Sequence, residues 1–80
     1  MEKEKTEESI KGRYRHYKRG RYEVLGVAWH TESREELVVY RPLDAQEEPG
    51  LPEFWVRPKA MFFDVLNIEG RETERFSKEK

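Results

Sequence analysis

The chain contains no cysteine among its 80 residues. This absence excludes a disulfide framework, a thiolate metal site and a thiol nucleophile. A domain of this size without disulfides must be held together by packing alone. The length leaves no room for both a catalytic and a substrate domain, so we expect one small domain.

Long apolar runs are also missing. The first ten residues, MEKEKTEESI, have no apolar stretch and so do not read as a signal peptide, and no run approaches the roughly 20 apolar residues that span a bilayer. We therefore expect a cytoplasmic protein without a membrane association. The chain also lacks a glycine-rich phosphate loop, a nucleophile elbow and an HExxH motif, which favours a protein that is not an enzyme.

Charged residues make up 41% of the chain and hydrophobic residues 35%, but the two kinds are unevenly distributed. Apolar and aromatic residues are concentrated between Tyr14 and Ile68, whereas both ends are polar. Six basic residues and no acidic one occur between Lys11 and Tyr22, although the formal net charge is −1. This basic block is the strongest charge asymmetry in the chain, and it predicts a local positive potential.

Alternating polar and apolar residues, separated by turn signals, predict short β-strands. We expect strands at residues 12–18, 22–30, 37–41, 54–57 and 64–68, a long loop at 42–53, and a helical turn at 59–62. Gly26 marks a bulge or bend within the second strand. The predicted fold is all-β, a small five-stranded SH3-like barrel that is partly open and mostly antiparallel, with the helical turn before the last strand. A hairpin-rich sandwich is the alternative.

The same pattern divides the chain into three parts. These are a flexible polar arm at residues 1–10, the small β-barrel domain at 11–69 and a polar C-terminal tail at 70–80. Within the tail, only Phe76 is suited to fold back onto the body. We expect Phe54, Phe62 and one of the tyrosines in the core, because so small a domain must bury most of its aromatic residues.

Four blocks of sequence, GRYRHYKRG, EVLGVAWHTES, EELVVYRPL and FWVRPKAMF, occur in this order between residues 11 and 69. Together they resemble a family of short bacterial proteins catalogued as a domain of unknown function. The resemblance covers most of the predicted domain. It implies no activity, cofactor or partner, because the family has no established function. Trp29 stands where the family tends to have a polar residue, which predicts an exposed tryptophan.

His16 and His30 are the only histidines. On a hairpin they could approach each other, with Glu32 nearby, and form a three-ligand zinc site or an acid–base pair. Histidines that bond to a backbone carbonyl or a tyrosine hydroxyl explain the pattern better, because a metal site needs a tight cluster and a supporting second shell. We therefore expect no metal and no cofactor. A small-molecule or nucleotide pocket between the two histidines, with weak catalysis, is the alternative function.

The basic block and the aromatic residues together indicate a binding face. Alternation places Arg13, Arg15 and Tyr17 on the same side of their strand. If the strand at 54–57 lies beside it, Trp55 and Arg57 extend the face, since an arginine next to an aromatic ring suits anion recognition. The predicted function is a non-catalytic binding module for an anionic protein tail or nucleic acid, with the partner itself unknown. The predicted binding residues are Arg13, Arg15, His16, Tyr17, Lys18, His30, Trp55 and Arg57.

Overall fold

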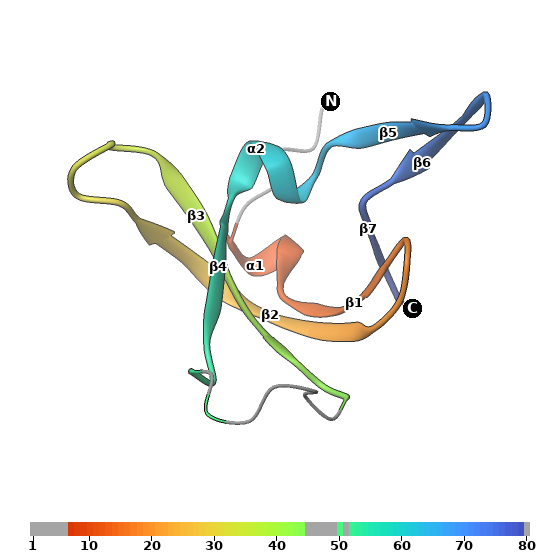
Figure 1. Ribbon diagram of the computed structural model, residues 1–80. Coiled ribbons are helices and arrows are strands. Elements are labelled where there is room, and N and C mark those ends of the chain that lie inside the picture. Colours follow the sequence, from red (N-terminus) through yellow and green to blue (C-terminus); the bar gives the residue numbers. More distant parts are fainter. Residues whose placement is uncertain (1–6, 45–49, 51, 80) are drawn as a thin grey trace.

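The structure is a computed structural model that describes residues 7–44, 50 and 52–79, with side chains from residue 9 onward. Its elements are α1 (Glu7–Ile10), β1 (Gly12–His16), β2 (Arg21–Trp29), β3 (Glu36–Pro42), β4 (Trp55–Pro58), α2 (Lys59–Phe62), β5 (Val65–Ile68), β6 (Arg71–Glu74) and β7 (Phe76–Lys78). Five strands form one sheet in the order β4-β3-β2-β1-β7, and β5 and β6 form a separate two-stranded sheet (Figure 1). Adjacent strands in both sheets run antiparallel.

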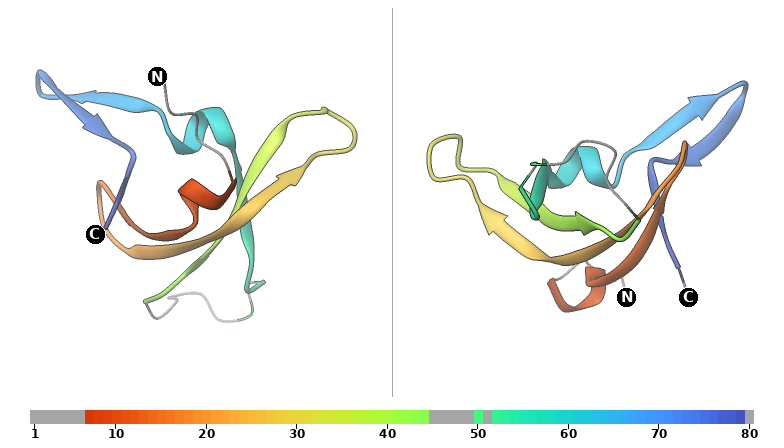
Figure 2. Two further views of the ribbon diagram at one scale, coloured as in Figure 1. Left: turned by 180° about the vertical axis from the view of Figure 1, so that it is seen from behind. Right: turned by 60° about the horizontal axis from the view of Figure 1, so that its bottom comes forward.

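The five-stranded sheet curls strongly but does not close into a barrel, and β4 and β7 are its two edges (Figure 1). The pairing of β2 with β3 shifts its register between Val24 and Gly26, which confirms the predicted irregularity and adds local twist. The turn between β1 and β2 depends on Gly20, whose φ is +99° and where a Cβ atom would lie 3.0 Å from the Tyr22 hydroxyl. Figure 2 shows α1 next to the start of β1, and in its right-hand view α1 lies outside the curve of β2.

The core lies on the concave side of the sheet. Its buried residues are Ile10, Tyr14, Val24, Val38, Tyr40, Phe62 and Phe76. Phe62 is 0% exposed and stacks on Phe76, with ring centroids 4.1 Å apart and an interplanar angle of 7°. Tyr14 and Tyr40 meet Phe62 edge-on, at centroid distances of 5.3 and 5.4 Å. The Tyr14 hydroxyl donates a hydrogen bond of 2.8 Å to the Ile10 carbonyl, which ties α1 to the core.

The all-β class, the antiparallel pairing and the helical turn before β5 confirm the predicted fold class. The structure has seven strands, two more than predicted. The additional strands, β6 and β7, lie in the segment 70–80 that was predicted to be a polar tail, so that prediction is wrong. Phe76 begins β7 and is 3% exposed, and β7 pairs with β1. A three-residue strand with one apolar side chain carries no alternation that a sequence could reveal.

Three smaller differences concern the ends of elements. Residues 1–6 of the predicted arm lie outside the described residues, but Ile10 ends a short helix and is 2% exposed. Phe54, which was expected in the core, is 55% exposed just before β4. Trp29 is exposed, as predicted. Residues 45–49 and 51 of the predicted long loop lie outside the described part of the chain. No helix within the described segments is long and apolar enough to cross a membrane.

Candidate functional site

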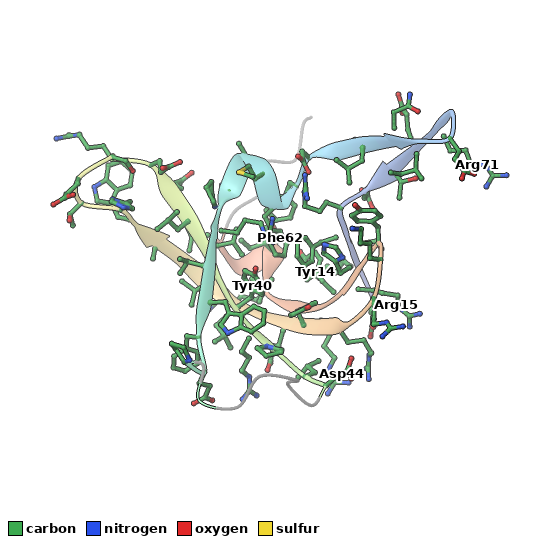
Figure 3. The ribbon with its side chains drawn as sticks, in the orientation of Figure 1. Tyr14, Arg15, Tyr40, Asp44, Phe62 and Arg71 are labelled. Carbon is green, nitrogen blue, oxygen red and sulfur yellow. The ribbon has the colours of Figure 1, made fainter. Side chains whose placement is uncertain are left out.

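The predicted binding residues divide between the two faces of the curled sheet. Arg13 and Arg15 are exposed on the convex side, and Figure 3 shows Arg15 pointing away from the interior that holds Tyr14. Trp55 and Arg57 lie on the concave side, where their side chains contact buried aromatic rings. The prediction that the strand containing Trp55 lies beside β1 is wrong, because β3 and β2 separate β4 from β1.

The basic residues of the convex side are matched by carboxylates. Arg21 donates a hydrogen bond of 3.1 Å to Glu79, and Arg15 lies 3.8 Å from the same carboxylate. Arg41 is bonded to Glu23 at 2.9 Å. The hydrogen bond from Arg21 holds the pKa of Glu79 below its ordinary value. Within the positive block seen in the sequence, Arg15 and Arg21 are therefore partly compensated by one shared carboxylate once the chain is folded.

The two histidines stand far apart. His16 ends β1, and its backbone N–H donates to the Gly20 carbonyl in the adjoining turn. His30 follows β2, is exposed, and its Nδ1 accepts backbone N–H bonds from Glu32 at 3.2 Å and Ser33 at 3.1 Å. The nine residues of β2 between them span roughly 30 Å. The alternative of a shared pocket or zinc site is thus wrong, and the described residues hold no group of three possible metal ligands.

A different set of side chains meets on the concave side. Arg57 reaches from β4 to β7, where its guanidinium carbon lies 5.5 Å from the centre of the Phe76 ring. Its Nε donates a hydrogen bond of 3.4 Å to the Tyr40 hydroxyl. The His16 ring meets Phe76 edge-on at 4.8 Å. Because the sheet curls, Arg57 and His16 contact one ring although they belong to strands that are not neighbours.

Two half-buried aromatic residues border this group. The Tyr22 ring lies 5.6 Å from that of Tyr40 and 6.0 Å from that of Trp55. The Trp55 indole N–H donates a hydrogen bond of 3.0 Å to the Pro52 carbonyl, which fixes the orientation of the ring. Burial raises the pKa of Tyr22, whereas the positive charge of Arg57 acts in the opposite direction. We refer to Arg57, His16, Tyr22 and Trp55 as the concave site, together with the exposed Lys18, whose ammonium lies over the Tyr17 ring that contacts His16.

His16 is held in its neutral form. Its Nδ1 accepts the backbone N–H of Lys18 at 3.2 Å, so the proton of the neutral ring sits on Nε2. Burial lowers the pKa of His16, and the positive charges of Arg57, Arg75 and Lys18 lower it further. The Lys18 ammonium lies 5.9 Å from the centre of the Tyr17 ring. The imidazole therefore presents an N–H donor within a positively charged environment.

Arg75 is hydrogen-bonded to a carboxylate, whereas Arg57 acts on the same carboxylate, Asp64, only through its charge. Arg75 makes a bidentate pair with Asp64, with Nε–Oδ1 and Nη2–Oδ2 distances of 2.8 and 3.2 Å. The backbone N–H of Arg75 also donates to the Asp64 carbonyl at 3.1 Å. Among the residues that the structure describes, no carboxylate bonds to Arg57. Arg57 is thus a half-buried cation whose hydrogen-bonded partner is a neutral hydroxyl.

The Asp64–Arg75 pair predicts how stability responds to acid. The hydrogen bond from Arg75 lowers the pKa of Asp64 below its ordinary value. A carboxyl group with a lowered folded-state pKa stabilises the fold above its unfolded pKa, and this contribution is lost as the pH falls through the folded value. We expect the thermal midpoint of the wild type to decrease once the pH is lower than about 4. The Asp64→Asn variant should show a smaller decrease.

Circular dichroism melts of both chains at pH 7, 4 and 3 measure the effect. Glu72→Gln is the matched control, because Glu72 is exposed on β6 and forms no ion pair with the described residues. Its melting profile should follow that of the wild type. Equal acid sensitivity of the Asp64→Asn variant and the wild type would show that the pair does not contribute.

A shallow groove of mixed charge lies between the end of β1 and strands β6 and β7. It is lined by Arg15, His16, Tyr17, Arg71, Glu72, Thr73, Glu74 and Ser77. Three predicted binding residues meet here, but two glutamates face two arginines across the groove. The groove therefore offers no excess of positive charge, in contrast to the concave site.

Three contributors to the concave side were not among the predicted binding residues. Tyr22 alternates with Val24, so a signal for its inward orientation was available. Phe76 was expected to fold back onto the body, and it is 3% exposed. No local pattern marks the strand that begins at Phe76 or the pairing of Arg75, because the contacts with β1 and Asp64 are made across the fold.

Comparison with known proteins places the chain in a family. A family model described as a protein of unknown function (DUF1653) matches residues 12–78, which extend from the start of β1 to the end of β7. No curated protein matches. The chain is similar to a solved crystal structure of a DUF1653 protein from Bordetella bronchiseptica, with 32% identity, a TM-score of 0.76, and coverage of 86% of this chain and 85% of that chain. These matches confirm the family resemblance, and the chain belongs to the DUF1653 family of proteins of unknown function.

Proposed function

We propose that this chain is a non-catalytic binding module that recognises an anionic group of its partner, a protein tail or a nucleic acid, at the concave site. The observation that carries the proposal is the environment of Arg57. This half-buried guanidinium lies between the Tyr40 hydroxyl and the Phe76 ring, without a bonded carboxylate in the described part of the chain. Removing a cation from water without a counter-ion costs free energy. An anion that binds Arg57 offsets this cost.

The state of His16 supports binding over catalysis. General base catalysis requires an unprotonated ring nitrogen that can reach the substrate and a second group that orients the ring. In His16 the unprotonated Nδ1 is occupied by the backbone N–H of Lys18. The other nitrogen, Nε2, carries the proton and can donate it in a hydrogen bond to an anion. Arg57 and His16 can therefore both donate hydrogen bonds to an anion.

Titration with inorganic phosphate, followed by two-dimensional NMR, tests this function. We expect the resonances of His16, Tyr22 and Arg57 to shift. The Arg57→Gln variant should bind phosphate at least about tenfold more weakly, because a charge-assisted hydrogen bond is lost. The substitution keeps a polar but uncharged side chain, and a melting curve checks that the variant is folded.

Arg13→Gln is the matched control. It removes the same charge from an exposed position of β1 on the convex side. This variant should bind phosphate as the wild type does. Equal weakening in the two variants would show that net charge alone determines binding. Shifts confined to the convex side would place the anion elsewhere.

A further inference from the structure

We propose that the natural ligand of the concave site is a nucleotide, in which a phosphate monoester binds the cations and the base stacks on Trp55. This inference rests on the proposed function and specifies its ligand. A phosphate monoester of this kind occurs in a free mononucleotide and in the phosphorylated terminal nucleotide of a strand. Both present one phosphate monoester and one planar ring to the site.

The charge of the site fits a phosphate monoester better than a carboxylate. Arg57 and Lys18 have no bonded carboxylate among the described residues, and the charge of Arg75 is matched by Asp64. The site therefore has two cations that lack a bonded carboxylate, and Asp64 acts on one of them, Arg57, only through its charge. A phosphate monoester carries about −1.5 to −2 charges at pH 7, and a carboxylate carries only one. His16 adds a neutral N–H donor for a third oxygen.

The aromatic residues of the site are suited to stack on a nucleobase. Trp55 and Tyr22 are half-buried and lie 6.0 Å apart, with their planes at 48°. The only polar atom of the Trp55 side chain is already bonded to the Pro52 carbonyl. What the half-buried indole still offers to a ligand is therefore apolar ring surface. Stacking on an aromatic surface accepts any base, since every base has a planar π-surface.

The charge of the concave site suits one phosphate group, since Arg57 and Lys18 are its cations without a bonded carboxylate among the described residues. On the convex side Arg15 and Arg21 share Glu79, and Arg41 is bonded to Glu23, which reduces the positive charge there. Binding to a single strand should accordingly release few counterions. The expected slope of log K against log salt is about −0.7 to −1.4, which corresponds to one or two phosphates.

Isothermal titration calorimetry with four small probes tests the assignment. The probes are uridine monophosphate, uridine, ribose 5-phosphate and O-phosphotyrosine. We expect the nucleotide to bind at least about tenfold more tightly than either the nucleoside or the sugar phosphate, because each of these lacks one of the two contacts. Tighter binding of O-phosphotyrosine would replace the nucleotide by a phosphorylated protein and overturn the inference.

Two variants separate the two contacts. Trp55→Leu should abolish the preference for the nucleotide over ribose 5-phosphate, whereas Arg57→Gln should weaken both. Trp29→Leu is the matched control, since Trp29 is 55% exposed outside the site, and melting curves verify that all three variants are folded. If Trp55→Leu does not fold, mapping the nucleotide's NMR shifts on the wild type decides whether the base lies at Trp55.

A twelve-nucleotide single strand with a 5′-terminal phosphate distinguishes the two sources. Affinity per site equal to that of the mononucleotide indicates a free nucleotide, and tighter binding with the shallow salt slope indicates one nucleotide of a strand. Both outcomes support the ligand chemistry. A slope steeper than about −3 would overturn it, because several phosphates would then be bound. Inorganic phosphate could shift the NMR resonances of the concave site while the nucleotide binds no more tightly than ribose 5-phosphate. In that case the inference fails and the proposed function stands.

Discussion

The Phe62→Ala variant is expected to lose about 3–5 kcal/mol of unfolding free energy, the range typical of a phenylalanine removed from a packed core. Phe62 is 0% exposed and contacts Tyr14, Tyr40 and Phe76, so the cavity cannot be filled by one neighbour. A domain of 80 residues has only about 4–12 kcal/mol of stability in total. The substitution should therefore remove much of the stability, and the thermal midpoint should fall by at least about 12 °C.

Phe54→Ala provides the comparison, because it is the same substitution at a residue that is 55% exposed. Its unfolding free energy should stay within about 0.5 kcal/mol of the wild type. Urea unfolding followed by circular dichroism measures both variants. Similar losses in the two would mean that Phe62 does not occupy the centre of the core, and a larger loss for Phe54→Ala would support the burial predicted from the sequence.

Local signals account for the parts of the fold that the sequence predicted well. Pro58 fixes the backbone just before the helical turn, and the turn Lys59–Phe62 forms at the predicted residues. Gly26 lies where the pairing of β2 and β3 shifts. Alternation placed Tyr14 and His16 on the side of β1 opposite to Arg13 and Arg15, as the burial pattern shows. Each of these features depends on residues close together in the chain.

The arrangement of the strands depends on long-range contacts that the sequence does not display. Consecutive strands usually pair, and this rule alone would place two strands, β2 and β3, between β1 and β4. The prediction instead put these strands side by side in order to join two sets of cations. What brings Arg57 to His16 is the curl of the sheet, together with Phe76 on a strand that was not anticipated. Twist and bulges accumulate over several strands, so the outcome is not readable from one segment.

The same difference between local signals and long-range contacts explains which residues of the candidate site were predicted from the sequence. Arg57 and Trp55 were chosen because an arginine lies close to an aromatic ring in the sequence, and both now border the concave site. Arg13 and Arg15 were chosen because their segment is basic. The sequence does not show which carboxylates lie near this segment in the fold. Glu79 lies 64 residues beyond Arg15 in the chain and was counted with the tail. A charge pattern therefore identifies a binding surface only when the pairing of charges is known.

A chain that ends at Arg75 is expected not to fold. The deletion removes the Phe76 ring, which is 3% exposed and contacts Phe62, Tyr40 and Tyr22, and it removes the strand that pairs with β1. Loss of a core phenylalanine alone costs about 3–5 kcal/mol, and the deletion also leaves β1 with an unpaired edge. The proton NMR spectrum of the shortened chain should lack the dispersed amide signals of a folded domain.

A chain that ends at Lys78 isolates the contribution of β7 itself. It keeps Phe76 and the pairing with β1, but loses Glu79, which bonds to Arg21 and whose N–H donates to the Arg13 carbonyl. This chain should remain folded with a slightly lower thermal midpoint, since exposed ion pairs contribute little. If the chain ending at Arg75 unfolds cooperatively at the wild-type midpoint, residues 76–80 are a tail as the sequence predicted. Because β7 supplies the ring that Arg57 and His16 share, binding of phosphate should fail together with folding in the shorter chain and persist in the longer one.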